Sequence, residues 1–340
     1  MKTIVIYYTA ALGYGHKRAA EVISEEWQKQ FPHDRVILSD GLRVVTPLLN
    51  PVVRILYSIA LQYTPKWYAK RYKETGKTIP FINFIKKRYE TNLKEYNPDI
   101  IITTQAFPAA IVNRLETSAK RVAVLTDYHL HKRWVNENFD IFSVPTQEIK
   151  DQLHKKGIAK EKIHITGIPI KKFTGNRKKE KHILIAGGGA GLVPFEKIVK
   201  EIDTCGYPLM ILLGKNNKIE KKLEKYPVTV KGFVTDIEKY YNESIIVITK
   251  PGGLTTTELM TMQKPMILID PLPGQEEANT QYLVNKGIAI HAKNMKELQE
   301  QLYFLLENKQ KREEMKKKAG ELGGSEAVVK IIQLLQDNQP

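Results

Sequence analysis

Short β-branched runs alternate with longer helical patterns along most of the 340-residue chain, and this alternation constrains the fold more than any other feature. It is typical of βα units that form a parallel sheet. The runs are almost entirely apolar, which predicts strands covered by helices on both faces. The first series of predicted strands is Thr3 to Thr9, Arg35 to Ser39, Asp99 to Thr103, Arg121 to Thr126, Ile141 to Val144 and Lys162 to Thr166. The second series is His182 to Ala186, Leu209 to Leu213, Val228 to Val230, Ile245 to Thr249, Met266 to Ile269 and Ile288 to His291.

A polar, basic stretch from Lys171 to Lys181 separates the two series and is interpreted as a linker. The sequence therefore predicts an α/β protein with two Rossmann-like, doubly wound domains, residues 1–170 and 182–324, facing each other across a cleft. Ligands of such open sheets bind outside the carboxyl ends of the strands. The last helical pattern, within residues 325–340, is a candidate to rejoin the first domain.

The positive charge is concentrated in the first half of the chain. The net charge of the whole chain is +16. Residues 1–179 hold 31 Lys and Arg against 16 Asp and Glu, a net of +15, whereas residues 180–340 hold 22 against 21, a net of +1. This asymmetry favours an anionic partner for the first domain, either anionic lipid or nucleic acid. The alternative is a lysine-rich surface without a partner.

About half of the excess charge lies between Gly41 and Glu90, where ten basic residues and two acidic ones are interleaved with eight aromatic residues. Basic, aromatic helices of this kind can lie in the headgroup region of an anionic membrane. The residues assigned to such a surface are Trp67, Lys70, Arg71 and Lys73. Two alternatives remain at this point, a core-facing helix with a solvated basic face and a nucleic-acid surface.

Membrane contact is expected to be peripheral, because the sequence has no uninterrupted apolar run of about 18 residues. Cys205 is the single cysteine, which excludes an intramolecular disulfide and a cysteine-based zinc site. Both features favour a soluble protein in a reducing, cytoplasmic setting. A signal-peptide interpretation of the first residues is disfavoured by Tyr7 and Tyr8.

The predicted strand-to-helix turn from Thr9 to Ala20, TAALGYGHKRAA, is the first candidate site. Gly13 and Gly15 allow a ligand to approach the backbone closely, and His16 follows at the start of the helix. A neutral imidazole at this point can accept a proton from an attacking hydroxyl. A histidine after glycines is also common as a capping or packing residue, so this motif alone is weak.

The second domain contains two candidate phosphate-binding turns. A glycine-rich turn follows its first strand and includes Gly188 and Gly189, and the turn after its fourth strand includes Gly252, Gly253 and Thr255. Both precede helices, whose free N–H groups can bind anions. Dinucleotide binding is disfavoured because no acidic residue ends the second strand of this domain, and capped helix starts are the alternative.

Polar side chains follow each of these turns. Glu258 lies in the helix after Thr255, where its carboxylate can accept both hydroxyls of a ribose. A further turn and helix start carry Gln275, Glu276, Glu277 and Asn279, whose amides and carboxylates suit the hydroxyls of a hexose. These features together predict a site for a sugar nucleotide.

The motif K-P-G-G-L-T-x-x-E followed by P-G-Q-E-x-x-N resembles the donor site of glycosyltransferase family 28. Within that family, the pattern is similar to monogalactosyldiacylglycerol synthases and bacterial processive diacylglycerol glucosyltransferases. The first half agrees, through G-x-G-H-x-x-A-A, the TDYHLHKRW segment and Gly167-Ile168-Pro169-Ile170. One departure is Gln105, where many relatives have histidine.

The resemblance implies the GT-B fold and an inverting transferase that needs no metal or other cofactor. It implies transfer of a hexose, with glucose expected, from a UDP-sugar to diacylglycerol or a glycosyl-diacylglycerol at the cytoplasmic face of the cell membrane. The implied general base is His16. The implied donor contacts are Gly15, Gly188, Gly189, Phe233, Gly252, Gly253, Thr255, Glu258, Gln275, Glu276 and Asn279, with the backbone near Phe233 next to the uracil. His131 and Trp134 match the acceptor-domain pattern without a defined role.

Three competing functions remain open from the sequence. The first is a UDP-GlcNAc transferase for a polyprenyl-linked peptidoglycan precursor, which would share the fold and the donor site. The second is a UDP-sugar epimerase of the same architecture, which would leave the basic aromatic segment unexplained. The third is a nucleic-acid-binding protein, which is disfavoured because the donor motifs lie in the neutral half.

Overall fold

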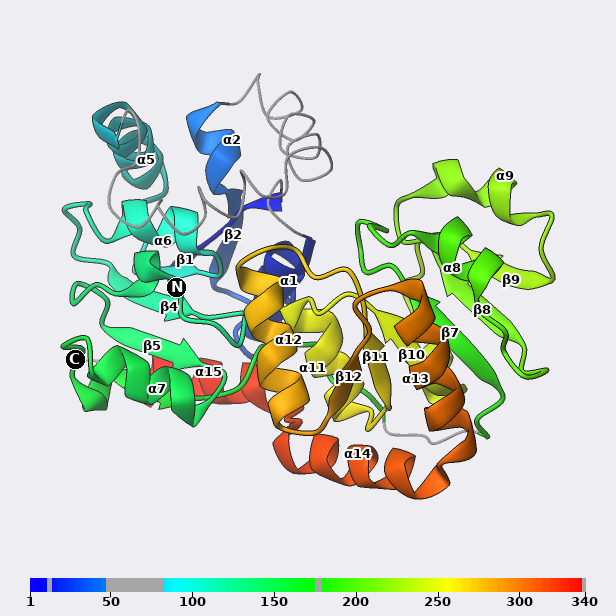
Figure 1. Cartoon of the computed structure of the whole chain (residues 1–340). Coiled ribbons are helices and arrows are strands. Elements are labelled where there is room, and N and C mark those ends of the chain that lie inside the picture. The colour runs from blue at the N-terminus through cyan, green and yellow to red at the C-terminus, as the bar shows by residue number, and fades with distance from the viewer. Residues whose placement is uncertain (11–13, 47–81, 175–178, 338–340) are drawn as a thin grey trace. The chain divides into compact units, whose positions relative to one another are not determined.

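The computed structural model describes residues 1–10, 14–46, 82–174 and 179–337 (Figure 1). All twelve predicted strands are present, and they form two parallel sheets of six strands each. The chain divides into two compact units, one with residues 1–171, 273–275 and 326–340, the other with residues 172–272 and 276–325. Most of the basic aromatic segment, including Trp67, Lys70, Arg71 and Lys73, lies outside the described residues.

The sheet of the first unit has the order β2-β1-β3-β4-β5-β6. Ile4 of β1 is opposite Val36 of β2 and Ile100 of β3, so β1 is a central strand with parallel neighbours on both sides. Each strand lies within two residues of its predicted bounds. The strands are β1 (Thr3–Tyr8), β2 (Arg35–Asp40), β3 (Ile100–Thr103), β4 (Lys120–Val124), β5 (Ile141–Val144) and β6 (Ile163–Ile165).

The two faces of this sheet are covered by different helices. Side chains alternate along a strand, so Ile4 and Ile6 pack with α1 and α15 while Val5 and Tyr7 pack on the opposite side with α5 and α6. The helices and 3-10 turns of this unit are α1 (Tyr14–Gln30), α2 (Gly41–Val45), α5 (Ile82–Tyr96), α6 (Ala106–Val112), η2 (Lys132–Trp134), α7 (Gln147–His154), η3 (Lys160–Lys162) and α15 (Ala327–Asp337). Both faces are apolar and covered, which explains why the strands lack polar alternation.

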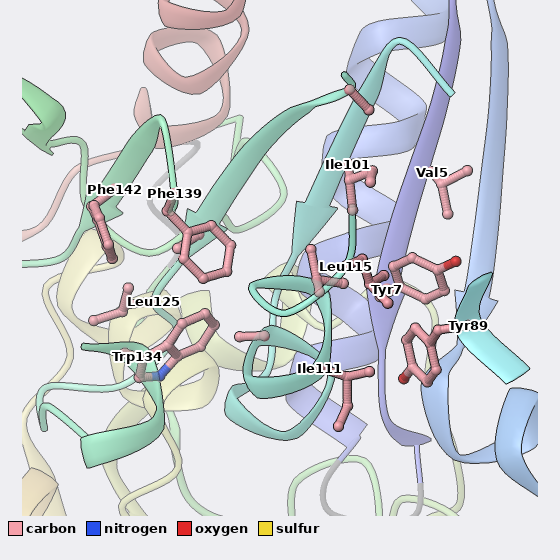
Figure 2. Packing of buried hydrophobic residues seen from close by; sticks show 14 of the residues in the cluster. Val5, Tyr7, Tyr89, Ile101, Ile111, Leu115, Leu125, Trp134, Phe139 and Phe142 are labelled. Atoms are coloured by element: carbon pink, nitrogen blue, oxygen red, sulfur yellow. The ribbon is translucent and has the colours of Figure 1, made fainter. Parts of the chain in front are cut away.

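Aromatic side chains fill the α5/α6 face of the sheet (Figure 2). The Tyr7 and Tyr89 rings lie 5.0 Å apart, and the Tyr7 hydroxyl donates a hydrogen bond of 2.8 Å to Asn92 Oδ1. Trp134 packs in the same cluster as Phe139 and Phe142.

The sheet of the second unit has the order β12-β11-β10-β7-β8-β9. Counted from β7, its strands follow the order 6-5-4-1-2-3 of a dinucleotide-binding sheet, with a change of direction between β7 and β10. Its strands are β7 (His182–Ala186), β8 (Leu209–Leu212), β9 (Val228–Lys231), β10 (Ser244–Thr249), β11 (Met266–Leu268) and β12 (Ala289–His291). Its helices and 3-10 turn are α8 (Phe195–Glu201), η4 (Asn217–Ile219), α9 (Glu220–Leu223), α10 (Glu238–Asn242), α11 (Gly253–Thr261), α12 (Gln275–Asn285), α13 (Met295–Glu307) and α14 (Lys309–Leu322).

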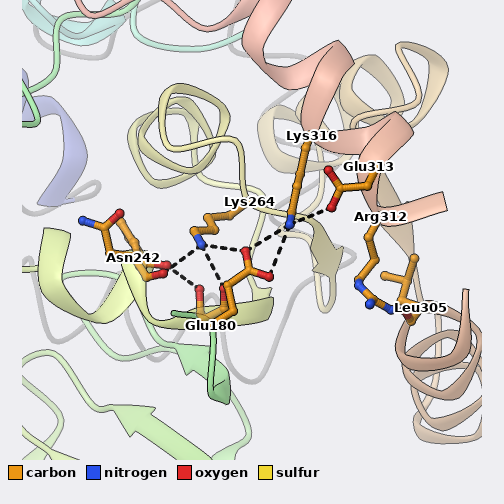
Figure 3. Close-up of polar contacts among 9 residues, drawn as sticks. Glu180, Asn242, Lys264, Leu305, Arg312, Glu313 and Lys316 are labelled. Carbon is orange, nitrogen blue, oxygen red and sulfur yellow. Dashed lines mark hydrogen bonds and ion pairs between the residues drawn. The ribbon is translucent and has the colours of Figure 1, made fainter. Parts of the chain in front are cut away.

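Ion pairs fasten the start of the second unit to its body (Figure 3). The Lys264 ammonium is almost fully buried and donates three hydrogen bonds of 3.0 Å, to Glu180 Oε1 and to the carbonyls of Asn242 and Ser244. Glu180 also pairs with Lys316 of α14 at 3.1 Å. All three protons of the buried ammonium are therefore used, as its burial requires.

Among the described residues, no helix is both long and apolar enough to cross a membrane.

Candidate active site

The candidate site of the first unit lies where β1, β3 and β4 end. In the first sheet β2 lies on one side of β1 and β3 on the other, so the order in which successive strands are added reverses between β1 and β3. Ligands of open α/β sheets bind at the carboxyl ends of strands at such a point. The residues that follow these strands are polar and buried: Thr9, His16, Thr104 and Thr126.

His16 lies in the first turn of α1 and is held by two threonines. Its Nδ1 atom is 2.8 Å from Thr126 Oγ1, and its backbone carbonyl accepts a hydrogen bond of 2.9 Å from Thr104 Oγ1. Thr126 Oγ1 in turn donates to the Thr104 carbonyl at 3.2 Å. Residues that are 88 and 110 positions from His16 in sequence therefore orient its ring and its backbone.

Burial lowers the pKa of His16 below its ordinary value, because a charged imidazolium loses solvation. The carboxylate of Asp127 and a hydrogen bond with the Thr104 backbone act in the opposite direction. His16 is therefore neutral at pH 7, the state that a proton acceptor needs. The side chain keeps 9% of its surface exposed.

The neighbouring signature residues have structural contacts. Gln105 Oε1 accepts a hydrogen bond of 2.7 Å from the Phe107 N–H and caps α6. His131 Nδ1 caps η2 by accepting from the Arg133 N–H at 3.1 Å, and Trp134 is in the core. Contact of His131 or Trp134 with an acceptor stays a prediction.

The second unit has a candidate site of its own, where β7 and β10 end side by side. Gly188 follows β7, and a β-carbon built on it would lie 3.9 Å from Thr255 Oγ1, so the glycine-rich turn and the start of α11 are neighbours. Gly191 has a φ of 68°, and a β-carbon there would clash with the Leu213 carbonyl oxygen. The turn can fold against β8 only because position 191 has no side chain.

The start of α11 is open to an anion. Gly252 is its N-cap and has no side chain, and apart from its chain neighbours and its own helix no atom of the described residues lies within 4 Å of a β-carbon built on it. The hydroxyls of Thr256 and Thr257 donate to backbone carbonyls of Gly252 and Gly253. Thr255 makes no side-chain hydrogen bond within the described part of the chain, so its hydroxyl and the first N–H groups of α11 are available.

Glu258 lies one turn further along α11 and is oriented by a residue that the sequence analysis did not select. The hydroxyl of Tyr241 donates a hydrogen bond of 3.2 Å to Glu258 Oε2. Tyr241 is fully buried, and burial raises the pKa of its hydroxyl well above the ordinary value, which keeps it a neutral donor. One carboxylate oxygen is thereby held in place.

The remaining predicted donor residues lie at several separate places in the two units. Glu276 Oε2 accepts from the Leu272 N–H at 2.7 Å, and Asn279 is fully buried and donates to the Pro251 carbonyl at 3.0 Å. Phe233 follows β9, is 49% exposed, and lies 5.7 Å from the Lys215 ammonium, centroid to nitrogen. Gln275 begins α12 and Gly15 lies in the first turn of α1. Their contacts with a donor stay predictions.

Solved structures with the same fold define the protein class. MurG of Acinetobacter baumannii matches with a TM-score of 0.64 at 18% identity, covering 99% of this chain and 100% of that one. UDP-GlcNAc 2-epimerase of Neisseria meningitidis, bound to UDP-GlcNAc, matches with a TM-score of 0.63 at 16% identity, covering 99% and 100%. The predicted two-domain α/β fold of GT-B type is confirmed, although these two structures leave a transferase and an epimerase equally compatible with it.

Sequence comparison separates these possibilities. The profile for monogalactosyldiacylglycerol (MGDG) synthase matches residues 16–170, and that for the glycosyltransferase family 28 C-terminal domain matches residues 182–335. Processive diacylglycerol beta-glucosyltransferase of Bacillus pumilus is 30% identical, with 92% of this chain and 89% of the relative covered. The chain therefore belongs to the group of glycosyltransferase family 28 that contains these glucosyltransferases, and it is a hexosyltransferase.

Sequence reasoning missed Thr104, Thr126 and Tyr241 as supports of the site. Thr126 opens the TDYHLHKRW segment that carried the family resemblance, so its position was marked without a role. Tyr241 had no signal, because a tyrosine in a short helix before a strand is ordinary core material.

Proposed function

We propose that this protein transfers a hexose, glucose in the first instance, from a UDP-sugar to diacylglycerol or a glycosyl-diacylglycerol with inversion at the anomeric carbon. The observation that supports this most is the buried, neutral His16 at the end of β1 in a chain about 30% identical to diacylglycerol glucosyltransferases. The family match favours transfer over epimerisation. The site is proposed to act at the cytoplasmic membrane surface.

In the proposed reaction, the acceptor hydroxyl attacks the anomeric carbon from the face opposite the departing UDP. The unprotonated ring nitrogen of His16 takes the hydroxyl proton as the new C–O bond forms. The bond between the anomeric carbon and the diphosphate oxygen breaks, and UDP leaves with its electron pair. General-base assistance of this type typically contributes about 100- to 10,000-fold in rate.

The negative charge that develops on the diphosphate needs compensation. The open start of α11 and the hydroxyl of Thr255 supply N–H and O–H donors beside the glycine-rich turn at Gly188. Preorganised donors of this kind stabilise a departing oxyanion without a proton or a divalent ion. We therefore expect activity to persist in EDTA, which a metal-dependent transferase would lose.

Lipid extraction after incubation with radiolabelled donors tests the function. The protein is mixed with diacylglycerol in anionic vesicles and, in separate reactions, with UDP-glucose, UDP-galactose or UDP-GlcNAc. We expect label in the lipid fraction with UDP-glucose, and a β-linked product by NMR from the α-linked donor. Label only in a polyprenyl-linked acceptor supplied with UDP-GlcNAc, or conversion of UDP-GlcNAc to its epimer without transfer, would refute the proposal.

Membrane association is tested through the basic segment, whose charge supports it. Each base near an anionic surface contributes about 1 kcal/mol, and salt screens this attraction. Replacing Lys70, Arg71 and Lys73 together by Ser should weaken sedimentation with anionic vesicles and leave UDP affinity unchanged. The matched control replaces Lys218, Lys221 and Lys222, exposed residues of the near-neutral second half, by Ser. Equal loss in both triple variants would mean that only total charge matters.

A further inference from the structure

Thr126 occupies a position in which its single hydroxyl proton can be assigned. Its Oγ1 lies 2.8 Å from His16 Nδ1 and 3.2 Å from the Thr104 carbonyl oxygen. Thr126 and Thr104 are almost completely buried, and the hydrogen bonds join the ends of β3 and β4 to α1. The three groups therefore share one largely buried hydrogen-bond network.

The Thr104 carbonyl can only accept, so the Thr126 hydroxyl uses its proton there. Thr126 Oγ1 is then left with lone pairs facing His16 Nδ1, and a short contact between them requires the proton to be on Nδ1. A neutral imidazole with a proton on Nδ1 has its free lone pair on Nε2.

Asp127 follows Thr126 directly and acts on the charge of the ring. Its carboxylate raises the pKa of His16 against the larger effect of burial. The imidazolium that forms after proton transfer would carry protons on both nitrogens, so it would keep the hydrogen bond from Nδ1 to Thr126 and gain the attraction of Asp127. The network needs no rearrangement during the reaction, which is the condition for efficient preorganised catalysis.

We propose that Thr126 is the positioning residue that holds the proton of His16 on Nδ1 and so aims Nε2 at the acceptor hydroxyl. The catalytic part of this inference rests on the proposed function, whereas the tautomer does not. Thr126 acts through His16 and touches no reacting atom. A threonine hydroxyl thereby orients the histidine and fixes its tautomer, as a carboxylate does in hydrolase triads, but the group in contact with the ring is uncharged.

Nitrogen-15 NMR of histidine-labelled protein without donor or acceptor tests the tautomer directly. The His16 signals are identified by their loss in His16→Gln. We expect the parent to show the proton on Nδ1, and Thr126→Val to show a mixture or the proton on Nε2. Thr126→Ser keeps the hydroxyl and should keep the Nδ1 proton. A parent protein with the proton on Nε2, or an unchanged tautomer in Thr126→Val, would overturn the proposal.

Kinetics of the same variants test the catalytic consequence. Thr126→Val should lower kcat by about 10- to 100-fold with little change in the donor KM, and Thr126→Ser should stay within about threefold of the parent. Thr166→Val is the matched control, because it removes another buried hydroxyl at a strand end, one bonded to Ser143 Oγ at 2.7 Å. It should lower stability similarly and leave kcat and the His16 tautomer unchanged.

The NMR and kinetic measurements distinguish a failure of the Thr126 proposal from a failure of the proposed function. Equal kinetic losses in Thr126→Val and Thr166→Val would reduce Thr126 to a structural residue and overturn its positioning role. A parent protein with the expected tautomer but without any glycolipid product would refute the proposed function and leave the tautomer assignment supported.

Discussion

The two units use the same architecture to present different chemistry at the ends of their first strands. After β1 the chain enters α1 with His16, whose ring contacts Thr126 and whose backbone carbonyl accepts a hydrogen bond from Thr104. After β7 it forms a glycine-rich turn, in which Gly191 packs against the Leu213 carbonyl at the end of β8 and Gly188 lies near Thr255. A parallel sheet thus fixes where the site is, and the residues of the first strand-to-helix turn decide whether a titratable side chain or backbone amides are placed there.

The two halves of the chain also differ in net charge. The half with the histidine carries +15 and the half with the glycine-rich turn carries +1. If a diphosphate binds to this nearly neutral half, as we propose, local N–H groups and not a general positive field should provide its affinity. The excess charge of the first half is then available for an anionic surface. The following predictions test this division of roles.

The largest expected effect is on turnover. His16→Ala should lower kcat by at least about 100-fold, because the loss of a general base removes help in the transition state. UDP affinity, measured by titration calorimetry, should change little because the predicted donor residues other than Gly15 and Gln275 belong to the other unit. His154→Ala, an exposed histidine at the end of α7, is the control and should retain full turnover. Normal turnover of His16→Ala would remove His16 from the mechanism.

The next effect is on the stability of the second unit. In Gly191→Ala the new methyl group would meet the Leu213 carbonyl as well as a positive φ, so we expect a loss of about 3 kcal/mol or more. Gly206→Ala is the matched control, since its φ is 80° but nothing lies within 4 Å of the added carbon. It should lose only about 1 to 2 kcal/mol. Equal losses in urea denaturation would show that packing against β8 is unimportant.

A smaller effect is expected on donor affinity. Glu258→Ala should weaken UDP binding by about 1 to 3 kcal/mol, the range for a lost charge-assisted hydrogen bond. Tyr241→Phe should weaken it less and should reduce the preference for UDP over 2′-deoxy-UDP, because the Glu258 carboxylate loses its orienting donor. Titration calorimetry measures both. If Glu258→Ala leaves the affinity unchanged, the ribose is bound elsewhere.

The smallest expected effect is a difference between the two units in how their stability depends on pH. Burial is the main cause that lowers the pKa of His16, His129, His131 and His164 in the first unit and of His182 and His291 in the second. The unfolded chain binds these protons near pH 6.5 and the folded chain does not, so stability is full above pH 6.5 and falls as the pH is lowered. His131, with a pKa of about 4, should by itself lower the free energy of unfolding by about 1 to 2 kcal/mol between pH 7 and pH 5.

Hydrogen exchange of the strand amides, corrected for intrinsic rates, measures this difference. Between pH 7 and pH 5, β1, β3 and β4 should lose more protection than β7 and β10. His131→Asn is the control variant, because asparagine can still cap η2 but does not titrate. It should reduce the loss in the first unit. Equal loss in both units, or no change in His131→Asn, would contradict the assignment.

The fold was largely predictable from local sequence patterns. All twelve strands lie where apolar, β-branched runs predicted them, because a buried parallel strand needs both faces apolar and this need is visible within a few consecutive residues. The turns around Gly188, Gly252 and His16 were likewise marked by residue types that the backbone requires there. The order of the strands was not predictable, since it depends on contacts between distant runs of nearly identical composition.

The sequence by itself determined the elements, the asymmetry of charge and the candidate residues at the strand ends. Only the tertiary structure decided which side chains serve those residues. Thr126 reaches His16 across 110 positions, and Tyr241 reaches Glu258 from a different helix. It also decided that Gln105 caps α6 and that Trp134 is in the core. The physical reason is that strand and helix formation depend on neighbours along the chain, whereas hydrogen bonds between strand ends depend on the order in which the sheet assembles.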